Sequence, residues 1–310
     1  MFSRLFGVGK PRLAVAFHES YILGQTFGQE GLFDPLRPFR IHEALSKHRK
    51  ARAIHRLRVE PARMEDLLRV HPRHYLERAR QASFLGEVFS MHRVDPWDTG
   101  IWEGILYATG GTLAAVDHAR RTGTPAANLS GGFHHATPDQ AAGFCVINDI
   151  AVAVAAQREN GFTRPIAVID LDYHHGDGTE ACLVADPLTW TFSLHPSAWQ
   201  ETGKREAIRR SVAVSVSDEG YLAAVREGLA ALAKQCQPAL VLYVAGVDPW
   251  CEDRLGDMRL SEEALLARDQ LVRAWADSFG AALAIVTAGG YGPEAWRPTA
   301  NFLASLLERK

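Results

Sequence analysis

The sequence has no long hydrophobic run, few cysteines and almost no excess of charge. None of its apolar stretches approaches the roughly 18 residues of a membrane-spanning helix, so we expect no membrane span. Its four cysteines show no C-x-x-C spacing, which argues against a disulfide framework and against a cysteine-type zinc site. The formal net charge is only −2 over 310 residues, which gives no overall attraction to nucleic acid or to a membrane surface.

A secretion signal, internal repeats and low-complexity linkers are also lacking. Glycine, lysine and proline interrupt the apolar stretch of the opening segment, MFSRLFGVGKPRLAVAF, which is unlike a secretory signal. We therefore expect a cytoplasmic protein whose cysteines are reduced and mostly buried. With 47% hydrophobic and 23% charged residues, the chain can form a sizeable core, and its length suits a single large domain over residues 1–310.

The segment 35–100 differs from the rest because arginine and histidine are frequent in it. Two readings are open, a basic patch that binds nucleic acid or ordinary solvated helix faces. Acidic residues are interspersed among the basic ones, and the total charge is nearly neutral, which favours the solvated faces. We therefore predict no direct binding of nucleic acid.

Short runs rich in valine, isoleucine, leucine and alanine alternate with helical patterns. Nearly continuous apolar runs are typical of strands that are covered on both faces of a parallel sheet. The runs occupy residues 12–17, 125–129, 165–171, 189–194, 211–216, 239–246 and 281–290, and the helical patterns occupy 149–160, 218–235 and 261–280. Ser261 is the expected N-cap of the last helix, and Gly280 follows its end. The alternation predicts an α/β domain with a central, mostly parallel sheet flanked by helices.

Polar clusters follow several of the predicted strands, at the sheet edge where open α/β sheets form their ligand sites. Asp172 and His174 are one residue apart, so in an extended segment their side chains lie on the same side. Taken alone, this pair reads more simply as a turn cap and a loop residue. Asp248, however, follows another strand and supplies a third donor, which favours one catalytic cation. Two carboxylates and one imidazole leave a position open for water and suit Zn²⁺ or Fe²⁺.

A pair of histidines, His134 and His135, stands in a glycine-rich loop after another predicted strand. A histidine that acts as a general base needs a carboxylate or a carbonyl on its other ring nitrogen. Asp170 and Asp177 are the carboxylates left over for this purpose. Tyr291 follows two glycines, where its hydroxyl can donate to a developing oxyanion, although taken alone it reads more simply as a packing residue.

Together, the blocks SGGFHHATPDQAAGFC, IDLDYHHGDG, YVAGVDPW and TAGGYG closely resemble the zinc-dependent histone deacetylase family of the arginase/deacetylase superfamily. This family also contains bacterial acetoin-utilisation proteins and acetylpolyamine amidohydrolases. The resemblance covers most of the chain in the family's order, and KREAIRR, DRLG, RDQLV and TAGGY look more like the class IV branch. It implies an arginase-like fold with a central parallel sheet.

The resemblance also implies roles for single residues. His135, oriented by Asp177, is the expected general base and acid, and His134 is oriented by Asp170. The residues that match the zinc ligands are Asp172, His174 and Asp248. Tyr291 matches the tyrosine that stabilises the transition state. Gly143 and Phe144 match the wall of the acyl-lysine tunnel. Arg40 matches the arginine beneath the active site. A monovalent cation, K⁺ or Na⁺, is implied at Asp170, Ser193 and Leu194, with backbone oxygens of Asp172 and His174.

Two parts of the implied site stay open. The stretch SLHPSAWQETGKREAIRR departs from the family pattern, so Trp199 is only a candidate for the second tunnel wall. In the family, an aspartate in this region binds the substrate backbone, and the loop 94–100 offers both Asp95 and Asp98 for that role without distinguishing them.

The implied activity is metal-assisted amide hydrolysis that removes acetyl or longer acyl groups from lysine side chains of proteins. An alternative with the same chemistry is a small-molecule deacetylase acting on acetylpolyamines or related amines, which Glu252 and Asp253 beside Asp248 keep open. A third reading, a catalytically silent binding protein, requires the loss of a ligand, a histidine or the tyrosine, and none of these is missing. The expected partner is therefore an acylated protein or a small acylated amine.

Overall fold

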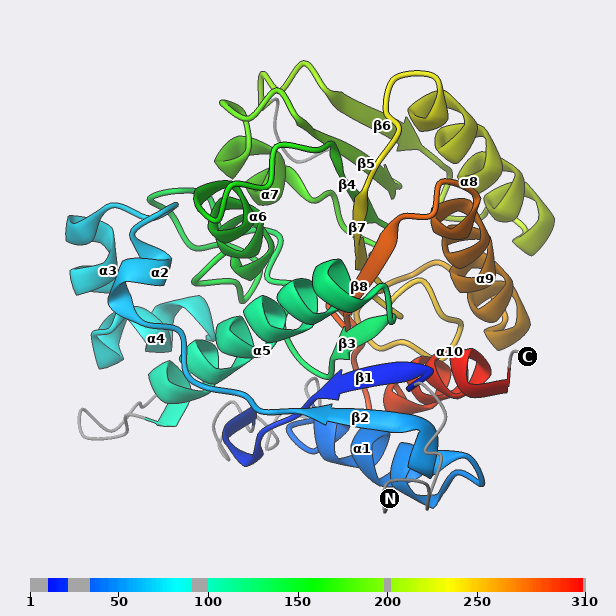
Figure 1. Cartoon of the computed structure of the whole chain (residues 1–310), viewed down its shortest axis with the longest axis horizontal. Helices are drawn as coiled ribbons and strands as arrows, with labels where there is room; N and C mark the ends of the chain where they lie inside the picture. Colours follow the sequence, from blue (N-terminus) through cyan, green and yellow to red (C-terminus); the bar gives the residue numbers. More distant parts are fainter. Residues whose placement is uncertain (1–10, 22–33, 91–99, 198–201, 309–310) are drawn as a thin grey trace, which may run out of the picture.

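Eight parallel strands form one sheet in the computed structural model, which describes residues 11–21, 34–90, 100–197 and 202–308 (Figure 1). The strand order is β2-β1-β3-β8-β7-β4-β5-β6, and all neighbouring strands pair in parallel. The strands are β1 (Leu13–Ala16), β2 (Ile54–Leu57), β3 (Ala126–Asn128), β4 (Ile166–Asp170), β5 (Thr189–His195), β6 (Ala207–Ser211), β7 (Leu240–Val244) and β8 (Ala282–Val286). The predicted α/β fold with a parallel central sheet is confirmed.

Helices cover both faces of this sheet (Figure 1). One face packs against α1 (Arg37–Lys47), α8 (Asp218–Ala233), α9 (Glu262–Ser278) and α10 (Trp296–Glu308), and the other against α5 (Gly100–Thr122) and α6 (Asp149–Glu159). Shorter helices are α2 (Met64–Leu67), α3 (Arg73–Ala79), α4 (Ala82–Val88) and α7 (Asp177–Cys182). Along β1, Leu13 and Val15 join the first core and Ala14 joins the second, because successive strand residues point to opposite faces.

At the edges of the sheet, one strand was predicted at the wrong residues and another was missed. The run 211–216 was expected to be a strand, but β6 ends at Ser211, and β2 was not expected at all. Both are edge strands, and both expose charged or polar side chains, such as Arg56 on β2 and Arg210 on β6. A continuous apolar run is therefore missing there, because only the inner strands are covered on both sides.

The three predicted helices form with side-chain caps at their starts. Ser261 Oγ accepts a hydrogen bond from Ala264 N at 3.0 Å, as expected for the N-cap of α9. Ser217 caps α8 and Asn148 caps α6 in the same way. The caps fix where each strand-to-helix loop ends.

The four central strands end level with one another, and this positions the site. The last residues of β3 and β8, Asn128 and Val286, are register partners, as are Val244 of β7 and Val286. Asp170 of β4 pairs with Val244. Loops that leave these carboxyl ends therefore start side by side at the same edge of the sheet.

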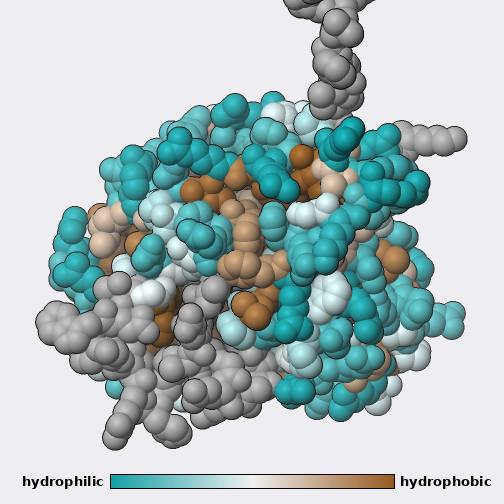
Figure 2. All heavy atoms as spheres, turned by 90° about the horizontal axis from the view of Figure 1, so that it is seen from below, coloured by the Kyte–Doolittle hydropathy of each residue, from teal (hydrophilic) through white to brown (hydrophobic). Residues whose placement is uncertain are grey.

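The surface of the described residues gives no sign of a membrane-spanning element. No helix among them is long and apolar enough to cross a bilayer. Figure 2, which views the molecule from below, shows a largely hydrophilic face with a few hydrophobic side chains gathered near its centre. All four cysteines are free, and Cys251 is exposed, whereas Cys145 and Cys236 are buried.

Candidate active site

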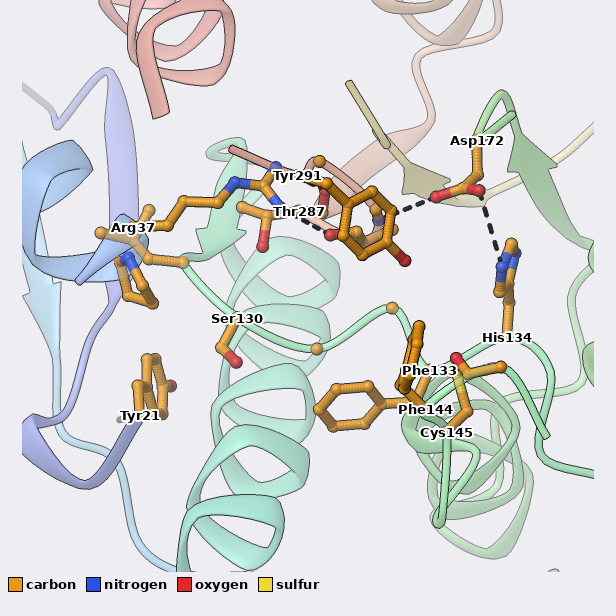
Figure 3. A pocket seen from close by; sticks show the side chains of 18 of the residues that line it. Tyr21, Arg37, Ser130, Phe133, His134, Phe144, Cys145, Asp172, Thr287 and Tyr291 are labelled. Atoms are coloured by element: carbon orange, nitrogen blue, oxygen red, sulfur yellow. Dashed lines mark hydrogen bonds and ion pairs between the residues drawn. The ribbon is translucent and has the colours of Figure 1, made fainter. Parts of the chain in front are cut away.

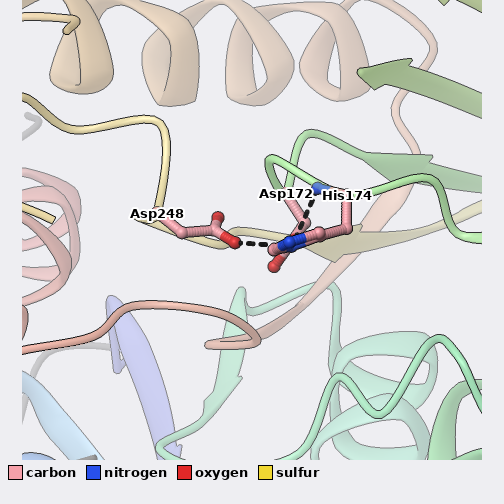
Figure 4. A group of neighbouring side chains, drawn as sticks. All are labelled: Asp172, His174 and Asp248. Carbon is pink, nitrogen blue, oxygen red and sulfur yellow. Dashed lines mark hydrogen bonds and ion pairs between the residues drawn. The ribbon is translucent and has the colours of Figure 1, made fainter. Parts of the chain in front are cut away.

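Three side chains beyond the carboxyl ends of β4 and β7 form the centre of the site (Figure 4). Asp172, His174 and Asp248 offer ligand atoms that all lie within 4.8 Å of one another. His174 Nδ1 lies 3.1 Å from Asp248 Oδ2 and 3.3 Å from Asp172 Oδ1. Both carboxylates are buried. The structure therefore brings together the three residues that the sequence singled out as metal ligands.

Backbone amides orient the two carboxylates. Tyr173 N donates to Asp248 Oδ1 at 2.9 Å, and Gly289 N, in the loop after β8, donates to Asp172 Oδ2 at 2.8 Å. A Cβ on Gly289 would lie 2.5 Å from Asp248 Oδ2 and 2.6 Å from Asp172 Oδ2. Only glycine lets the backbone come this close to both acids, so Gly289 serves the cluster as well as the loop that carries Tyr291.

The charges of the cluster fit a divalent cation. Burial opposes ionisation of Asp172, yet His134 and His174 hold the pKa of that carboxyl well below its usual value. Burial and the charge of Asp172 raise the pKa of Asp248 to about 7. Burial lowers the pKa of His174, but Asp172 and Asp248 overcome this effect and raise it to about 10. Two buried carboxylates that repel each other around one imidazole form an oxygen–oxygen–nitrogen donor set, which suits Zn²⁺ or Fe²⁺.

Each of the paired histidines is held by its own aspartate. His134 Nδ1 lies 2.8 Å from Asp170 Oδ2, and His135 Nδ1 lies 3.1 Å from Asp177 Oδ1. These are the pairings that the resemblance implied. Burial and the neighbouring His134 lower the pKa of His135 to about 4. Burial also acts to lower the pKa of His134, but Asp170 and Asp172 raise it to about 9. The two adjacent imidazoles therefore have very different environments.

The loop that presents the histidines is tied to a carboxylate that the sequence analysis missed. Asp149, the first residue of α6, accepts hydrogen bonds from Gly132 N at 3.0 Å, Phe133 N at 2.8 Å and Thr112 Oγ1 at 2.5 Å. Gly131 and Gly132 have φ angles of +79° and +83°, which favour glycine. An aspartate inside the otherwise apolar stretch CVINDIAVAV was the available signal for this role.

A pocket of about 140 Å³ opens onto the reactive groups (Figure 3). Gly143 and Phe144 line it, as the resemblance implied. The Phe144 ring is nearly parallel to that of Phe89, with centroids 6.5 Å apart, so Phe89 is a further aromatic wall that the sequence did not reveal. Tyr21 lies at the end of the pocket away from Asp172 (Figure 3).

Tyr291 enters the pocket from the loop after β8 (Figure 3). Its backbone N donates to Asp253 Oδ2 at 2.7 Å, and Asp253 Oδ1 accepts from Leu255 N and Gly256 N at 2.8 Å each. Burial and the charge of Asp248 raise the pKa of the Tyr291 hydroxyl well above its usual value, so it remains a proton donor in a hydrogen bond. Asp253 therefore anchors the tyrosine loop.

The arginine that the resemblance placed beneath the site was assigned to the wrong residue. Arg40 lies 3.3 Å from Asp34, donates to Pro293 O at 2.9 Å, and its side chain is 38% exposed. Arg37 is buried, lines the pocket, and donates from Nη1 to Ala288 O at 2.7 Å. Arg37 opens α1 and reaches the end of β8, whereas Arg40 points out of the pocket. The sequence RPFR alone does not distinguish the two.

The remaining expected positions have mixed outcomes. Asp170 and Ser193 are register partners on β4 and β5, and the adjacent Leu194 is buried, which is compatible with the implied monovalent cation site. The cation itself stays a prediction. Trp199, Asp95 and Asp98 lie outside the described residues.

Comparisons with known proteins identify the family. The model of the histone deacetylase domain matches residues 33–307. The chain is 36% identical over 197 residues to an uncharacterised protein of Picosynechococcus, covering 63% of this chain and 65% of that protein. It is 32% identical over 253 residues to a histone deacetylase-like amidohydrolase of Pseudomonas aeruginosa, covering 77% of this chain and 66% of the relative. The chain thus spans about two thirds of the length of these curated relatives.

Solved structures agree with the expected fold. A crystal structure of a histone deacetylase homologue in complex with SAHA is 26% identical, with a TM-score of 0.79, and covers 97% of this chain and 85% of the homologue. A homologue from Aquifex aeolicus has a TM-score of 0.76 at 25% identity, covering 97% of this chain and 85% of that one. With the domain match over residues 33–307, these similarities establish that the chain belongs to the histone deacetylase family.

Proposed function

We propose that this chain is a metal-dependent amidohydrolase that removes acetyl or longer acyl groups from lysine side chains of proteins. The observation that carries the proposal is the convergence, on one pocket, of the buried Asp172–His174–Asp248 cluster and the hydrogen-bonded His135–Asp177 pair. A Zn²⁺ or Fe²⁺ ion held by the cluster would polarise the amide carbonyl and the attacking water.

The protein's own groups supply the proton transfers. His135 Nδ1 is engaged by Asp177, so Nε2 is left to take a proton from water and to return it to the departing amine. The Tyr291 hydroxyl donates to the oxyanion that develops on the carbonyl. His134, held by Asp170 and 3.7 Å from Asp172 Oδ1, shapes the field around the carboxylates. The aromatic walls Phe89 and Phe144 suit the methylene chain of a lysine.

The polyamine alternative loses part of its basis in the structure. Asp253 is buried and already accepts three backbone hydrogen bonds, so it is not free to bind an ammonium group of the substrate. Glu252 lies 3.6 Å from Arg297, and neither acid lines the pocket. Acyl-lysine in a protein is therefore the favoured substrate, and acetylated polyamines serve as the competing arm of the test.

Replacing Tyr291 with phenylalanine should reduce turnover without unfolding the protein. Removal of one oxyanion donor in other enzymes costs about 10²–10³ in turnover, or about 3–4 kcal/mol, and we expect a similar loss here. Melting temperature and metal content should stay close to those of the parent protein. Tyr107→Phe, which removes a hydroxyl outside the pocket lining, is the matched control. Normal turnover of Tyr291→Phe would show that another group holds the oxyanion.

The acyl preference is set by the space beyond the reacting carbonyl, and we expect acyl groups longer than acetyl to be hydrolysed at least as well as acetyl. The pocket lining continues past the histidines to Leu129, Ser130 and Tyr21. Each buried methylene contributes up to about 0.8 kcal/mol, so an accommodating pocket rewards longer chains. The measurement is kcat/KM for acetyl-, butyryl-, octanoyl- and myristoyl-lysine in one peptide, beside acetylated polyamines.

A pocket-filling variant provides the control for this series. Ser130→Phe should reduce kcat/KM for the long chains more than for acetyl, because the added ring overpacks the far part of the pocket. A monotonic fall from acetyl onward in the parent protein would refute the expected preference. Faster hydrolysis of acetylpolyamines than of every peptide would favour the small-molecule alternative.

A further inference from the structure

A buried arginine from the helix layer reaches the strand ends that carry the metal ligands. Arg268 on α9 has no exposed surface. Its Nη1 donates to Leu171 O at 2.9 Å and to Gly246 O at 2.8 Å. Leu171 directly precedes Asp172, and Gly246 lies two residues before Asp248. One nitrogen atom therefore bridges the backbones of the two loops that supply the cluster.

This bridge begins where the sheet stops. The ladder between β4 and β7 ends at the pair Asp170 and Val244, and Leu171 N still donates to Val244 O at 3.1 Å. Beyond this point the ladder no longer pairs the two chains, and the carbonyls of Leu171 and Gly246 need another donor. Arg268 supplies it for both. It thus fixes how far apart the two chains are as they leave the sheet.

The guanidinium is itself held in a fixed orientation. Arg268 Nε donates to Asp269 Oδ1 at 2.9 Å, and Arg268 Nη2 lies 2.8 Å from the same oxygen. Tyr243 of β7 donates its hydroxyl to Asp269. A lysine could not reproduce this arrangement, because only the planar fork of arginine can bind a carboxylate on one side and two carbonyls on the other.

Stability alone is a poor explanation for such a group. A fully buried ion pair loses the hydration of both charges, and replacing it with apolar residues of similar size is often neutral or stabilising. The contacts of Arg268, in contrast, are directed at the two backbones that carry Asp172 and Asp248. We propose that Arg268 is a positioning residue that sets the separation of these ligands and thereby the affinity of the metal site. This inference rests on the proposed function, because it assumes that the cluster binds metal.

The test measures Zn²⁺ affinity on the metal-free full chain, by titration against a competing chelator, together with the absorption spectrum of the Co²⁺-loaded protein. Arg268→Met should weaken Zn²⁺ binding by about 10- to 100-fold, the range typical of groups that orient metal ligands, and should alter the Co²⁺ spectrum. Its melting temperature should also fall, because Asp269 is left buried and unpaired.

A triple variant separates positioning from stability. Tyr243→Phe, Arg268→Met and Asp269→Leu together remove the buried ion pair and the hydroxyl that donates to Asp269, so the melting temperature should recover while Zn²⁺ affinity stays low. Arg268→Lys should likewise keep more stability than affinity. Arg273→Met, on the same helix but paired with Asp277 at 2.8 Å, should change neither property.

The outcomes are distinct. Parental Zn²⁺ affinity and an unchanged Co²⁺ spectrum in the triple variant would overturn the positioning role. Failure of the parent protein to bind one Zn²⁺ would instead overturn the proposed function, and this inference with it.

Discussion

Replacing Asp248 with alanine is expected to abolish hydrolysis and to reduce the zinc that the protein binds. Asp248 is fully buried and lies 3.1 Å from His174, so its loss removes one of the two carboxylate donors from the proposed three-ligand cluster. A cation held by only Asp172 and His174 would lack the charge compensation of the second carboxylate. The experiment compares metal content, measured by elemental analysis, with deacylation of one acyl-lysine peptide.

The control for this prediction is an acid close to the site but outside the cluster. Asp257 is exposed and accepts a hydrogen bond from Tyr173, so Asp257→Ala should keep both metal and most of the activity. Asp172→Ala and His174→Ala should behave like Asp248→Ala. Stoichiometric zinc in all three single variants would rule out this cluster as the metal site.

Replacing His135 with alanine should be at least ten times more damaging to kcat than replacing His134. His135 bonds to Asp177 through Nδ1, which orients the ring for proton transfer at Nε2. General acid–base groups contribute about 10²–10⁴ to the rate, so the loss should lie in that range. His134 instead bonds to Asp170, at the end of β4 and beside the segment of the proposed metal ligands, where we expect it to act mainly through the local field.

The comparison requires equal metal content in both variants, because His134 also lies 3.7 Å from Asp172. His42→Ala, a histidine that stacks on Phe17 outside the catalytic pocket, controls for the general effect of losing an imidazole. Equal losses, or a greater loss in His134→Ala, with metal retained in both, would contradict this division of roles.

The architecture explains why these residues lie together. Four inner strands end level, and the loops after them carry the histidine pair, the two segments of the Asp172–His174–Asp248 cluster and the tyrosine. Backbone amides then link the loops, since Gly289 donates to Asp172 and Tyr291 donates to Asp253. A change in one loop is therefore expected to be felt in its neighbours.

Much of this arrangement could be predicted from the sequence, because it depends on local spacing and on strand ends. The apolar runs identified the inner strands, since strands covered on both faces contain few polar residues. Asp172 and His174 are one residue apart in the same segment, so their proximity follows from the chain itself. The pairings of His134 with Asp170 and of His135 with Asp177 came from the resemblance, and the structure places both pairs within hydrogen-bonding distance.

The tertiary structure decided what depends on contacts between distant segments. It placed Arg37 rather than Arg40 in the pocket, because only the helix start reaches the end of β8. It also revealed Asp149 and Asp253 as the acids that hold the histidine and tyrosine loops through backbone amides. Arg268 acts on carbonyls 97 and 22 positions away in the sequence. By itself the sequence determined the candidate groups for the chemistry, since these residue types form short local motifs. The groups that hold them in place are seen only in the folded structure, because a backbone carbonyl or amide carries no side-chain signature in the sequence.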